Sequence, residues 1–299
     1  MTNPDDPQVR QIYKKWLLHF STAPWLSTVE VPDHVGYHLS LSFDDPTYPL
    51  ADADKREIYK VGVCLLWEFV RTSDKYKVLM QLSESEVGNP LRIWHQGRLV
   101  SSDIVHSVRE RNMLLESLSY EGTEGCIVGE LGAGHGRLAE VFGHTTNYRY
   151  YIFDITPALY VSQWYIKKIF PGERIFEFRH FDHFEEIREE LQNCRYAFFT
   201  ANQIEKIPDG HVHLFINSTS LMEMRMDQIK NYLRHIDRMT TTAFLSRQFL
   251  KWKNRFDKLV ISKDTFSMSG NWTLILDEVD DIYPEFFNQI WIKNGGCDT

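Results

Sequence analysis

A glycine-rich turn stands near the middle of the chain, Glu130-Leu131-Gly132-Ala133-Gly134-His135-Gly136-Arg137. An apolar run, residues 126–131, precedes it and predicts a buried strand, and an amphipathic run, residues 137–142, follows it and predicts a helix. Glycine has no Cβ, so the backbone of a strand-to-helix turn of this kind can approach a ligand closely. A dinucleotide-binding turn has the spacing G-x-G-x-x-G, whose third glycine would fall on Arg137. The spacing therefore disfavours a nicotinamide dinucleotide.

An acidic residue follows this turn at the distance that ribose recognition requires. Asp154 lies 22 residues after Gly132, within a second predicted strand, residues 148–155. A carboxylate at that place can accept hydrogen bonds from both hydroxyls of a ribose. The alternative is that Asp154 only caps the helix that Thr156 and Pro157 begin.

Strands and helices alternate through the second part of the chain, which predicts a parallel sheet with helices on both faces. The further predicted strands are residues 196–200, 213–217, 242–246, 272–279 and 286–293, and the last two form an antiparallel-looking pair. With 196–200 as the third strand, residues 173–195 become an insertion; alternatively, that segment supplies Phe181 or Asp182 to an adenine ring. A polar, glycine-bearing link at 121–125 divides the chain into a mainly helical region, 1–122, and a sheet region, 123–299.

The composition describes a globular chain of 299 residues with a formal net charge of −8. Binding of nucleic acid through its phosphates needs clustered Lys and Arg, so no nucleic-acid partner is expected. The four cysteines lie far apart and form no C-x-x-C pair, so we expect a reducing, cytoplasmic setting. No apolar run approaches membrane-spanning length, and no pattern indicates an oligomeric state.

The pattern E-x-G-x-G-x-G from Glu130 to Gly136, followed by Asp154, resembles motif I of the class I S-adenosylmethionine-dependent methyltransferases. Residues 154–163 and 217–224 further resemble the sugar O-methyltransferases encoded among polysaccharide-biosynthesis genes. The resemblance is best from about residue 88 to residue 295. It implies S-adenosylmethionine as the cofactor and a doubly wound α/β fold. The expected sheet is Rossmann-like, seven-stranded and mostly parallel, with an antiparallel C-terminal strand, and the helical N-terminal extension caps the substrate.

The resemblance also implies site residues near the carboxyl ends of the strands. Glu223 and His135 are the candidates for the general base, with a helix-start acid and a spacer as the plainer interpretations. Arg247 and Gln248 are the candidates for substrate contact; the alternative for Arg247 is a surface ion pair. The residues expected to bind the cofactor are Glu130, Gly132, Ala133, Gly134, Gly136, Asp154, Ile155, Asn202, Gln203, Asn217 and Ser218.

One short acidic stretch offers possible metal ligands, namely Asp182, His183, Glu185 and Glu186. A charged helix start explains the same cluster, so no metal is expected.

The function expected from these patterns is methyl transfer from S-adenosylmethionine to a sugar hydroxyl, in surface polysaccharide or glycoconjugate biosynthesis. The first alternative is a methyltransferase that acts on a small carboxylate, amine or phenol. The others are a nicotinamide-dependent oxidoreductase on a Rossmann sheet and a binding module that kept the fold without turnover.

Overall fold

The computed structural model describes residues 53–118, 125–254, 256–268 and 270–295. The chain divides into two compact units, residues 1–113 with 281–283 and residues 114–280 with 284–299. The glycine turn and every sequence-predicted site residue lie in the second unit.

The described part of the first unit is built from helices and one short hairpin. Its elements are α3 (Ala53–Arg71), β1 (Ile93–His95), β2 (Arg98–Val100) and the greater part of α4 (Ser102–Ser117). Helix α3 lies in the region expected to be mainly helical and buries Val63, Leu66 and Val70. The Arg109 guanidinium on α4 donates to Asp281 Oδ1 at 2.7 Å, which holds residues 281–283 in this unit.

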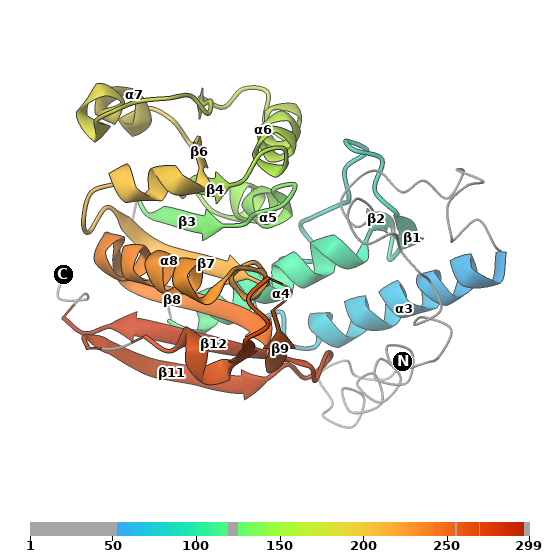
Figure 1. Cartoon of the computed structure of the whole chain (residues 1–299). Coiled ribbons are helices and arrows are strands. Elements are labelled where there is room, and N and C mark those ends of the chain that lie inside the picture. The colour runs from blue at the N-terminus through green and yellow to red at the C-terminus, as the bar shows by residue number, and fades with distance from the viewer. Residues whose placement is uncertain (1–52, 119–124, 255, 269, 296–299) are drawn as a thin grey trace. The chain divides into compact units, whose positions relative to one another are not determined.

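The second unit is built on an eight-stranded sheet with the order β11-β12-β8-β7-β3-β4-β6-β5 (Figure 1). The strands are β3 (Ile127–Leu131), β4 (Arg149–Asp154), β5 (Ile175–Phe176), β6 (Tyr196–Thr200), β7 (Val212–Ser218), β8 (Thr240–Phe249), β11 (Trp272–Val279) and β12 (Phe286–Lys293). Neighbouring strands run parallel except at β12, which is antiparallel to both β8 and β11. The expected mostly parallel sheet with an antiparallel C-terminal strand is confirmed, with eight strands where seven were expected.

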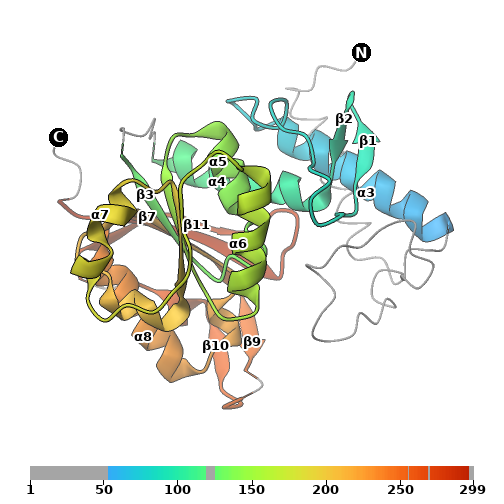
Figure 2. The same ribbon diagram turned by 90° about the horizontal axis from the view of Figure 1, so that it is seen from above.

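Helices cover both faces of this sheet (Figure 2). Helices α5 (Arg137–Thr145) and α6 (Ala158–Ile169) lie on one face, and α7 (Arg188–Gln192) and α8 (Met226–Met239) lie on the other. The buried core on the α7 and α8 face includes the stacked rings of Phe153 and Phe199, whose centroids are 5.1 Å apart. Phe215 stacks on Phe153 at 6.2 Å. These aromatic side chains join three strands into one rigid platform.

Short 3-10 helices and a hairpin complete the unit. They are η1 (Phe184–Glu186), η2 (Ala201–Lys206), η3 (Leu221–Glu223), η4 (Lys263–Phe266), and β9 (Lys251–Lys253) paired with β10 (Val260–Ser262).

The eighth strand comes from the segment between α6 and β6. Strand β6 pairs with β4, so residues 196–200 are the third strand as predicted. Strand β5 pairs with the outer side of β6, which makes residues 173–195 an insertion at the sheet edge. Phe181 of this insertion is buried in the core, whereas Asp182 is exposed.

The start of α6 differs from the prediction. The helix begins at Ala158, with Pro157 as its N-cap residue and no side-chain cap hydrogen bond. The prediction that Thr156 and Pro157 begin the helix is therefore wrong by two residues, and Asp154 does not cap the helix. Proline fits this place because the first turn of a helix leaves its N–H groups unpaired in any case.

Candidate functional site

The carboxyl ends of the parallel strands gather the sequence-predicted residues at one edge of the sheet. Strand β3 leads into the glycine turn, β4 ends at Asp154, and β7 ends at Ser218. In open α/β sheets, ligands bind outside this edge, where neighbouring strands connect in opposite directions. Strand β3 is such a place. The chain continues from β3 to its neighbour β4 on one side, and after β6 it crosses back to β7, which is the neighbour of β3 on the other side.

The turn after β3 is tight and depends on its glycines. Gly132, Gly134 and Gly136 have φ angles of 77°, 58° and 90°, in the left-handed region that disfavours side chains. The Gly132 N–H donates to Phe153 O at 2.8 Å, and this bond ties the turn to β4. A Cβ on Gly132 would lie 2.3 Å from the side chain of Ser220, so this position accepts glycine alone.

Asp154 is joined directly to the glycine turn. The Gly134 N–H donates to Asp154 Oδ2 at 3.0 Å, and the Ile155 N–H donates to Oδ1 at 2.7 Å. Burial raises the pKa of this carboxyl from 3.8 to about 6, although hydrogen bonds from the backbone of Ile155, Gly134 and Ala133 act in the opposite direction. The carboxylate is therefore poorly solvated, and further hydroxyl donors would stabilise it.

Arg137, at the position of the third dinucleotide glycine, is buried at the start of α5. Its guanidinium donates to Glu140 Oε2 at 2.6 Å, and the Tyr165 hydroxyl donates to the same oxygen at 2.7 Å. The ring of His135 packs edge-on against Tyr165, with centroids 5.5 Å apart. Arg137 therefore joins α5 to α6, and His135 is half-buried beside that junction.

Glu130 is buried on β3, where its Oε2 accepts a hydrogen bond from the Tyr150 hydroxyl at 2.8 Å. Glu130 therefore also has a structural role, because this hydrogen bond joins β3 to β4.

Asn217 and Gln248 form a buried polar network between the ends of β7, β3 and β8. Asn217 Nδ2 donates to Leu131 O at 2.8 Å and to Ser220 Oγ at 2.6 Å. Gln248 Nε2 donates to Asn217 Oδ1 at 2.5 Å, and Gln248 Oε1 accepts the Met222 N–H at 3.2 Å. Both amides are fully buried. The network holds η3 against the glycine turn, so these two side chains position the edge of the sheet.

Replacement of Gln248 by leucine should therefore destabilise the fold. The substitution leaves Asn217 Oδ1 with one donor fewer and the buried Met222 N–H without its acceptor, at a cost of about 1–3 kcal/mol. Urea unfolding of the wild-type chain and the variant measures this difference. A free energy of unfolding equal to that of the wild type would show that the amide is dispensable.

Asn202 and Gln203, expected near the adenine, have different environments. Gln203 is buried, its Oε1 accepts the Thr200 N–H at 2.9 Å, and its Nε2 donates to Arg179 O at 2.8 Å. Its amide therefore fixes the start of η2. Asn202 is exposed at the same edge, and Ile155 is also exposed.

The two candidates for the base lie on different segments, Glu223 on η3 and His135 within the glycine turn. Glu223 is the last residue of η3, and its side chain is exposed. The Glu223 N–H donates to the carbonyl of Ser220, the residue that packs on Gly132. Glu223 therefore stands one short turn away from the glycine loop. The half-buried His135 lies within the loop and contacts α6.

Arg247 is almost buried at the end of β8. Its Nε donates to Asp280 Oδ2 at 3.3 Å, and its guanidinium lies 4.2 Å from the centroid of the Phe286 ring. The carbonyl of Arg247 accepts the Thr219 N–H at 2.7 Å, beside the half-buried Ser218. The charge of Arg247 is thus paired within the protein, in agreement with the ion-pair alternative, although the partner is buried.

Two contributors to the site could not be recognised in the sequence. Ser220 supplies the contact that requires glycine at 132, and Thr219 adopts a φ angle of 64° to bring it there. Serine and threonine after a strand carry no motif, so the only available signal was their position between Asn217 and Glu223.

Within the described residues, no group of three or more His, Cys, Asp or Glu side chains is arranged to hold a metal ion. None of the helices in the described part of the chain combines the length and apolarity needed to cross a membrane.

Comparisons with known proteins give three results. The family model of the PX domain matches residues 167–252, which run from the last turn of α6 to β9 and cut through the sheet. This match covers a minor part of the chain and no separate unit, so it does not assign the chain to a family. The comparison with curated proteins gave no match.

Several solved structures are similar to the chain. One is a SAM-dependent methyltransferase from Aquifex aeolicus, with 14% identity, 62% of this chain and 89% of that chain covered, and a TM-score of 0.40. Geranyl diphosphate methyltransferase in complex with SAM has 9% identity, covers 64% and 85%, and has a TM-score of 0.42. The 1,6-didemethyltoxoflavin-N1-methyltransferase of Burkholderia thailandensis, with bound S-adenosylhomocysteine, has 12% identity, covers 64% and 79%, and has a TM-score of 0.40. Likeness at this level is too weak to assign an activity.

Proposed function

We propose that this chain is an S-adenosylmethionine-dependent O-methyltransferase whose acceptor is a sugar hydroxyl. The observation that carries the proposal is the hydrogen bond from the Gly134 N–H to Asp154 Oδ2. It joins a glycine turn of the methyltransferase spacing to an acid at the end of the next strand, at the ligand-binding edge of the sheet. Arg137, with its buried ion pair to Glu140, favours this cofactor over a nicotinamide dinucleotide.

The residues at this edge fit the proposed cofactor. Asp154 is a poorly solvated carboxylate that two ribose hydroxyls would stabilise. Asn202 and Ile155 are both exposed, and they are the residues proposed to contact the adenine. Bound S-adenosylmethionine supplies an electrophilic methyl group on its sulfonium sulfur. The chain itself has to orient the acceptor oxygen toward that methyl group and accept the proton that the hydroxyl loses.

Glu223 is the proposed general base. Its carboxylate is exposed at the site edge, and η3 is anchored through Ser220 to Leu131 O at 2.9 Å. The base is therefore carried by a segment that cannot shift independently of the glycine turn. His135 is the second candidate for this role.

An aromatic surface at the same edge supports a sugar acceptor. Phe249 stacks on Trp252 at 5.1 Å and on Phe286 at 4.2 Å, and all three rings are partly exposed. Phe249 is covered by the two other rings, and Phe286 also by the Arg247 guanidinium, so Trp252 is the ring proposed to pack on the apolar face of a pyranose. A small carboxylate would instead require a cation, and the charge of Arg247 is already paired with Asp280.

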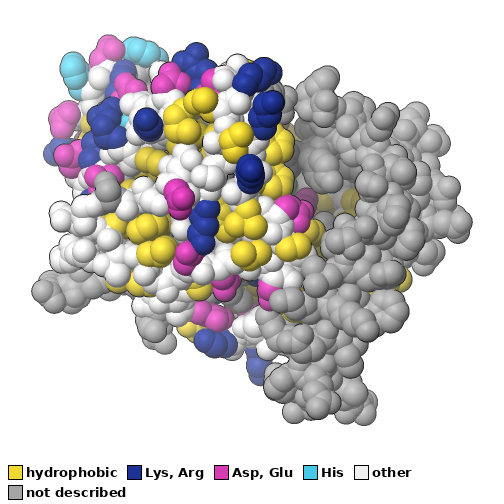
Figure 3. Space-filling model, turned by 60° about the horizontal axis from the view of Figure 1, so that its bottom comes forward, with side chains coloured by type: hydrophobic (Ala, Val, Ile, Leu, Met, Phe, Trp, Pro, Cys, Tyr) yellow, Lys and Arg dark blue, Asp and Glu magenta, His cyan; other side chains and the backbone are white. Residues whose placement is uncertain are grey.

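The charge distribution supports an acceptor other than nucleic acid. On the face shown in Figure 3, described Lys and Arg side chains are interspersed with Asp and Glu and with apolar side chains. A phosphate-tracking surface would instead require clustered positive charge. No disulfide joins Cys64, Cys126 or Cys194 in the described part of the chain, and this supports the proposed cytoplasmic setting.

Calorimetric titration with S-adenosylmethionine, S-adenosylhomocysteine and NAD tests the cofactor. We expect binding of the first two and no heat with NAD; the reverse result would contradict the proposal. Methyl transfer from labelled cofactor to a panel of sugars, carboxylates, amines and phenols then tests the acceptor. A methylated sugar identified by mass spectrometry supports the sugar assignment, and label on another class alone overturns it.

Replacing Asp154 by alanine should weaken binding of S-adenosylhomocysteine about ten- to a hundredfold, because hydrogen bonds to a charged group each contribute about 1.5–3 kcal/mol. Calorimetry measures the change in Kd. Asp209→Ala, at an exposed position before the start of β7 and therefore at the opposite edge of the sheet, is the matched control and should leave Kd unchanged. Equal Kd values for Asp154→Ala and wild type would contradict the ribose-binding role.

Cofactor affinity should fall at acidic pH. The pKa of Asp154 in the folded chain is raised to about 6, so its carboxylate is lost as the pH falls through that value. Since the ribose requires the ionised form, Kd should rise about tenfold per pH unit below pH 6 and stay level above it. The free energy of unfolding of the unliganded chain has the opposite pH dependence. The raised pKa of Asp154 stabilises the fold below about pH 4, and this contribution is lost as the pH rises through about 6. The Asp154→Asn variant should bind the cofactor weakly, and its Kd should not rise further as the pH falls below 6. Calorimetry between pH 5 and 8 measures this dependence. If the Kd of the variant rose with falling pH as steeply as that of the wild type, another group would be responsible for the titration.

A further inference from the structure

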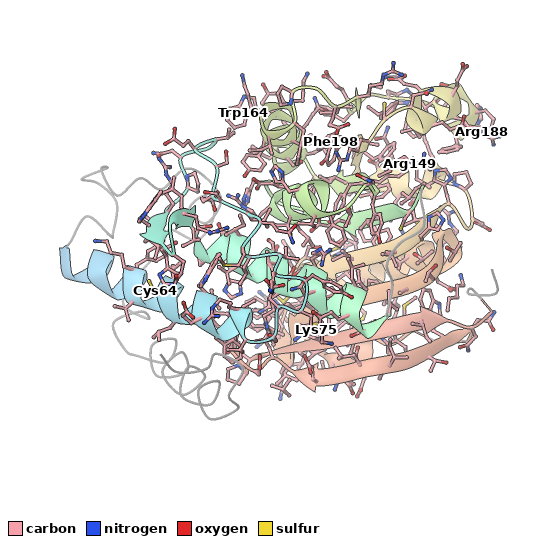
Figure 4. The ribbon with its side chains drawn as sticks, turned by 180° about the vertical axis from the view of Figure 1, so that it is seen from behind. Cys64, Lys75, Arg149, Trp164, Arg188 and Phe198 are labelled. Atoms are coloured by element: carbon pink, nitrogen blue, oxygen red, sulfur yellow. The ribbon has the colours of Figure 1, made fainter. Side chains whose placement is uncertain are left out.

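A cysteine, a histidine and a glutamate meet in the first unit, whereas all the proposed cofactor residues belong to the second. Cys64 and Glu68 lie four residues apart on α3, so their side chains share one side of the helix. His95 is the last residue of β1, and the β1–β2 hairpin brings it to that side of α3. Figure 4 shows Cys64 on α3 beside this hairpin.

The imidazole of His95 connects the thiol to the carboxylate. Cys64 Sγ lies 3.4 Å from His95 Nδ1, and His95 Nε2 lies 3.1 Å from Glu68 Oε1. An ionised carboxylate only accepts hydrogen bonds, so in the neutral imidazole Nε2 carries the proton and donates it to Glu68. Nδ1 is then an acceptor, and the thiol of Cys64 donates to it. A nucleophile, a base and a group that orients the base are arranged in this order in nucleophilic catalysis.

Glu68 is held as a carboxylate by its other contacts. Arg71 donates to its Oε2 through Nε at 2.9 Å and Nη2 at 2.6 Å, and Gln96 Nε2 donates to its Oε1 at 3.3 Å. Burial acts to raise the pKa of Glu68, but the hydrogen bonds from Arg71, His95 and Gln96 lower it below its ordinary value. The ring of His95 also packs edge-on against Trp67, with centroids 6.0 Å apart. The imidazole is thus held in one orientation from two sides.

Cys64 differs from the other cysteines that the structure describes. It is half-buried, whereas Cys126 and Cys194 are buried. Burial, and to a smaller extent the Glu68 carboxylate, raises the pKa of the Cys64 thiol. The thiol is therefore protonated near neutral pH and needs a base that accepts its proton as it reacts. His95 Nδ1 lies at the distance that this proton transfer requires.

We propose that Cys64 is a reversible modification site that reacts with small-molecule disulfides, with His95 as its base and Glu68 as the residue that positions the base. His95 Nδ1 accepts the thiol proton while the Cys64 sulfur attacks one sulfur of the disulfide. The new S–S bond forms as the old one breaks. The other half leaves as a thiolate and takes the proton from His95. Cys64 is thereby oxidised to a mixed disulfide, and the departing half of the reagent is reduced to a thiol.

The class of reagent follows from the groups that the site contains. Hydrolysis of an ester or amide needs donors that stabilise an oxyanion, in addition to a nucleophile and a base. Exchange with a disulfide needs a deprotonated sulfur and a leaving thiol, and no oxyanion forms. Val61 lies one turn before Cys64 on the same side of α3 and is 43% exposed, so it offers an apolar contact to an uncharged reagent.

Bis(2-hydroxyethyl) disulfide is the probe, because it is uncharged and has no titratable group. The full chain is incubated with it at pH 7, and peptide mass spectrometry follows the mixed disulfide at each cysteine, including Cys297, which lies outside the described residues. Cys64 should react at least about tenfold faster than Cys126 and Cys194, and dithiothreitol should reverse the modification. A Cys64 that reacts as slowly as these buried thiols would overturn the proposal.

His95→Gln tests the base. The variant should modify Cys64 at least about tenfold more slowly at pH 7 and should recover rate as the pH rises, because the thiol then ionises without a base. His180→Gln, at an exposed histidine of the second unit, is the matched control and should react as the wild type does. Partial unfolding would have the opposite sign, since it would speed the reaction of Cys126 and Cys194. Equal Cys64 rates in His95→Gln and wild type would contradict the role of His95.

Glu68→Gln tests the positioning residue independently. Glutamine keeps the size of the side chain and an oxygen acceptor for His95 Nε2, but it lacks the negative charge. The midpoint of the pH–rate profile for Cys64 should therefore move to lower pH, because the charge that stabilises both the imidazolium and the protonated thiol is lost. A carboxylate that only braces the fold would leave this midpoint where it is in the wild type, and that result would contradict the proposed role of Glu68.

Discussion

Gly132→Ala should weaken cofactor binding about a hundredfold and lower the free energy of unfolding by about 2–5 kcal/mol. The left-handed conformation of Gly132 disfavours a side chain by roughly 1–2 kcal/mol. The new methyl group would also lie 2.3 Å from the Ser220 side chain, and overpacking of this kind costs typically about 1–3 kcal/mol. Relief of the contact moves the turn, and a displacement of about 1 Å at a binding site can reduce its efficiency about a hundredfold.

Chemical denaturation and titration with S-adenosylhomocysteine measure both effects. Gly172→Ala is the matched control, since a Cβ at that position has no atom within 4 Å. The double variant Gly132→Ala with Ser220→Gly removes the steric contact and should recover part of the stability, while the strained φ angle remains. Wild-type affinity in folded Gly132→Ala would show that the cofactor does not bind at this turn.

Glu223→Gln should reduce kcat for methyl transfer to the sugar about 10²–10⁴-fold and leave the Kd for S-adenosylhomocysteine unchanged. A positioned general base contributes typically about this factor, and glutamine keeps the size of the side chain while losing its basicity. Because the side chain is exposed, the substitution should leave the free energy of unfolding nearly unchanged.

The readout is the initial rate at saturating cofactor and acceptor, compared with Glu189→Gln, an exposed glutamate on α7. A Glu223→Gln enzyme with the kcat of the wild type would eliminate Glu223 as the base. His135→Gln would then be the decisive variant, because His135 is the other titratable candidate beside the glycine turn.

Local patterns predicted the frame of the molecule well. The glycine spacing and the distance to Asp154 are properties of one strand-turn-helix-strand unit, so they can be read within about thirty residues. The two closing strands, 272–279 and 286–293, were predicted with their observed bounds because each is a run bounded by turn residues. The strand β5 was ambiguous because two paired residues give no periodicity.

Contacts between distant segments were beyond a single sequence. Asn217 and Gln248 are the kind of polar residues that often contact a ligand, but their partners are Leu131, Ser220 and Met222 on other elements. The sequence around an asparagine or glutamine does not show whether its amide is buried in a structural network or exposed to bind a ligand. Arg247 was ambiguous for the same reason, because its partner Asp280 lies 33 residues away.

The network between Asn217, Gln248 and Leu131 also has a consequence for how the protein opens. Its hydrogen bonds connect the ends of three neighbouring strands, so breaking one bond exposes polar groups of the other two. Such segments exchange their amide hydrogens as one cooperative unit. The amides of Leu221 and Met222, which donate to Asn217 and Gln248, should therefore exchange with deuterium together and only when the centre of the sheet opens. The segment that carries the proposed general base would then be among the last parts of the chain to unfold locally.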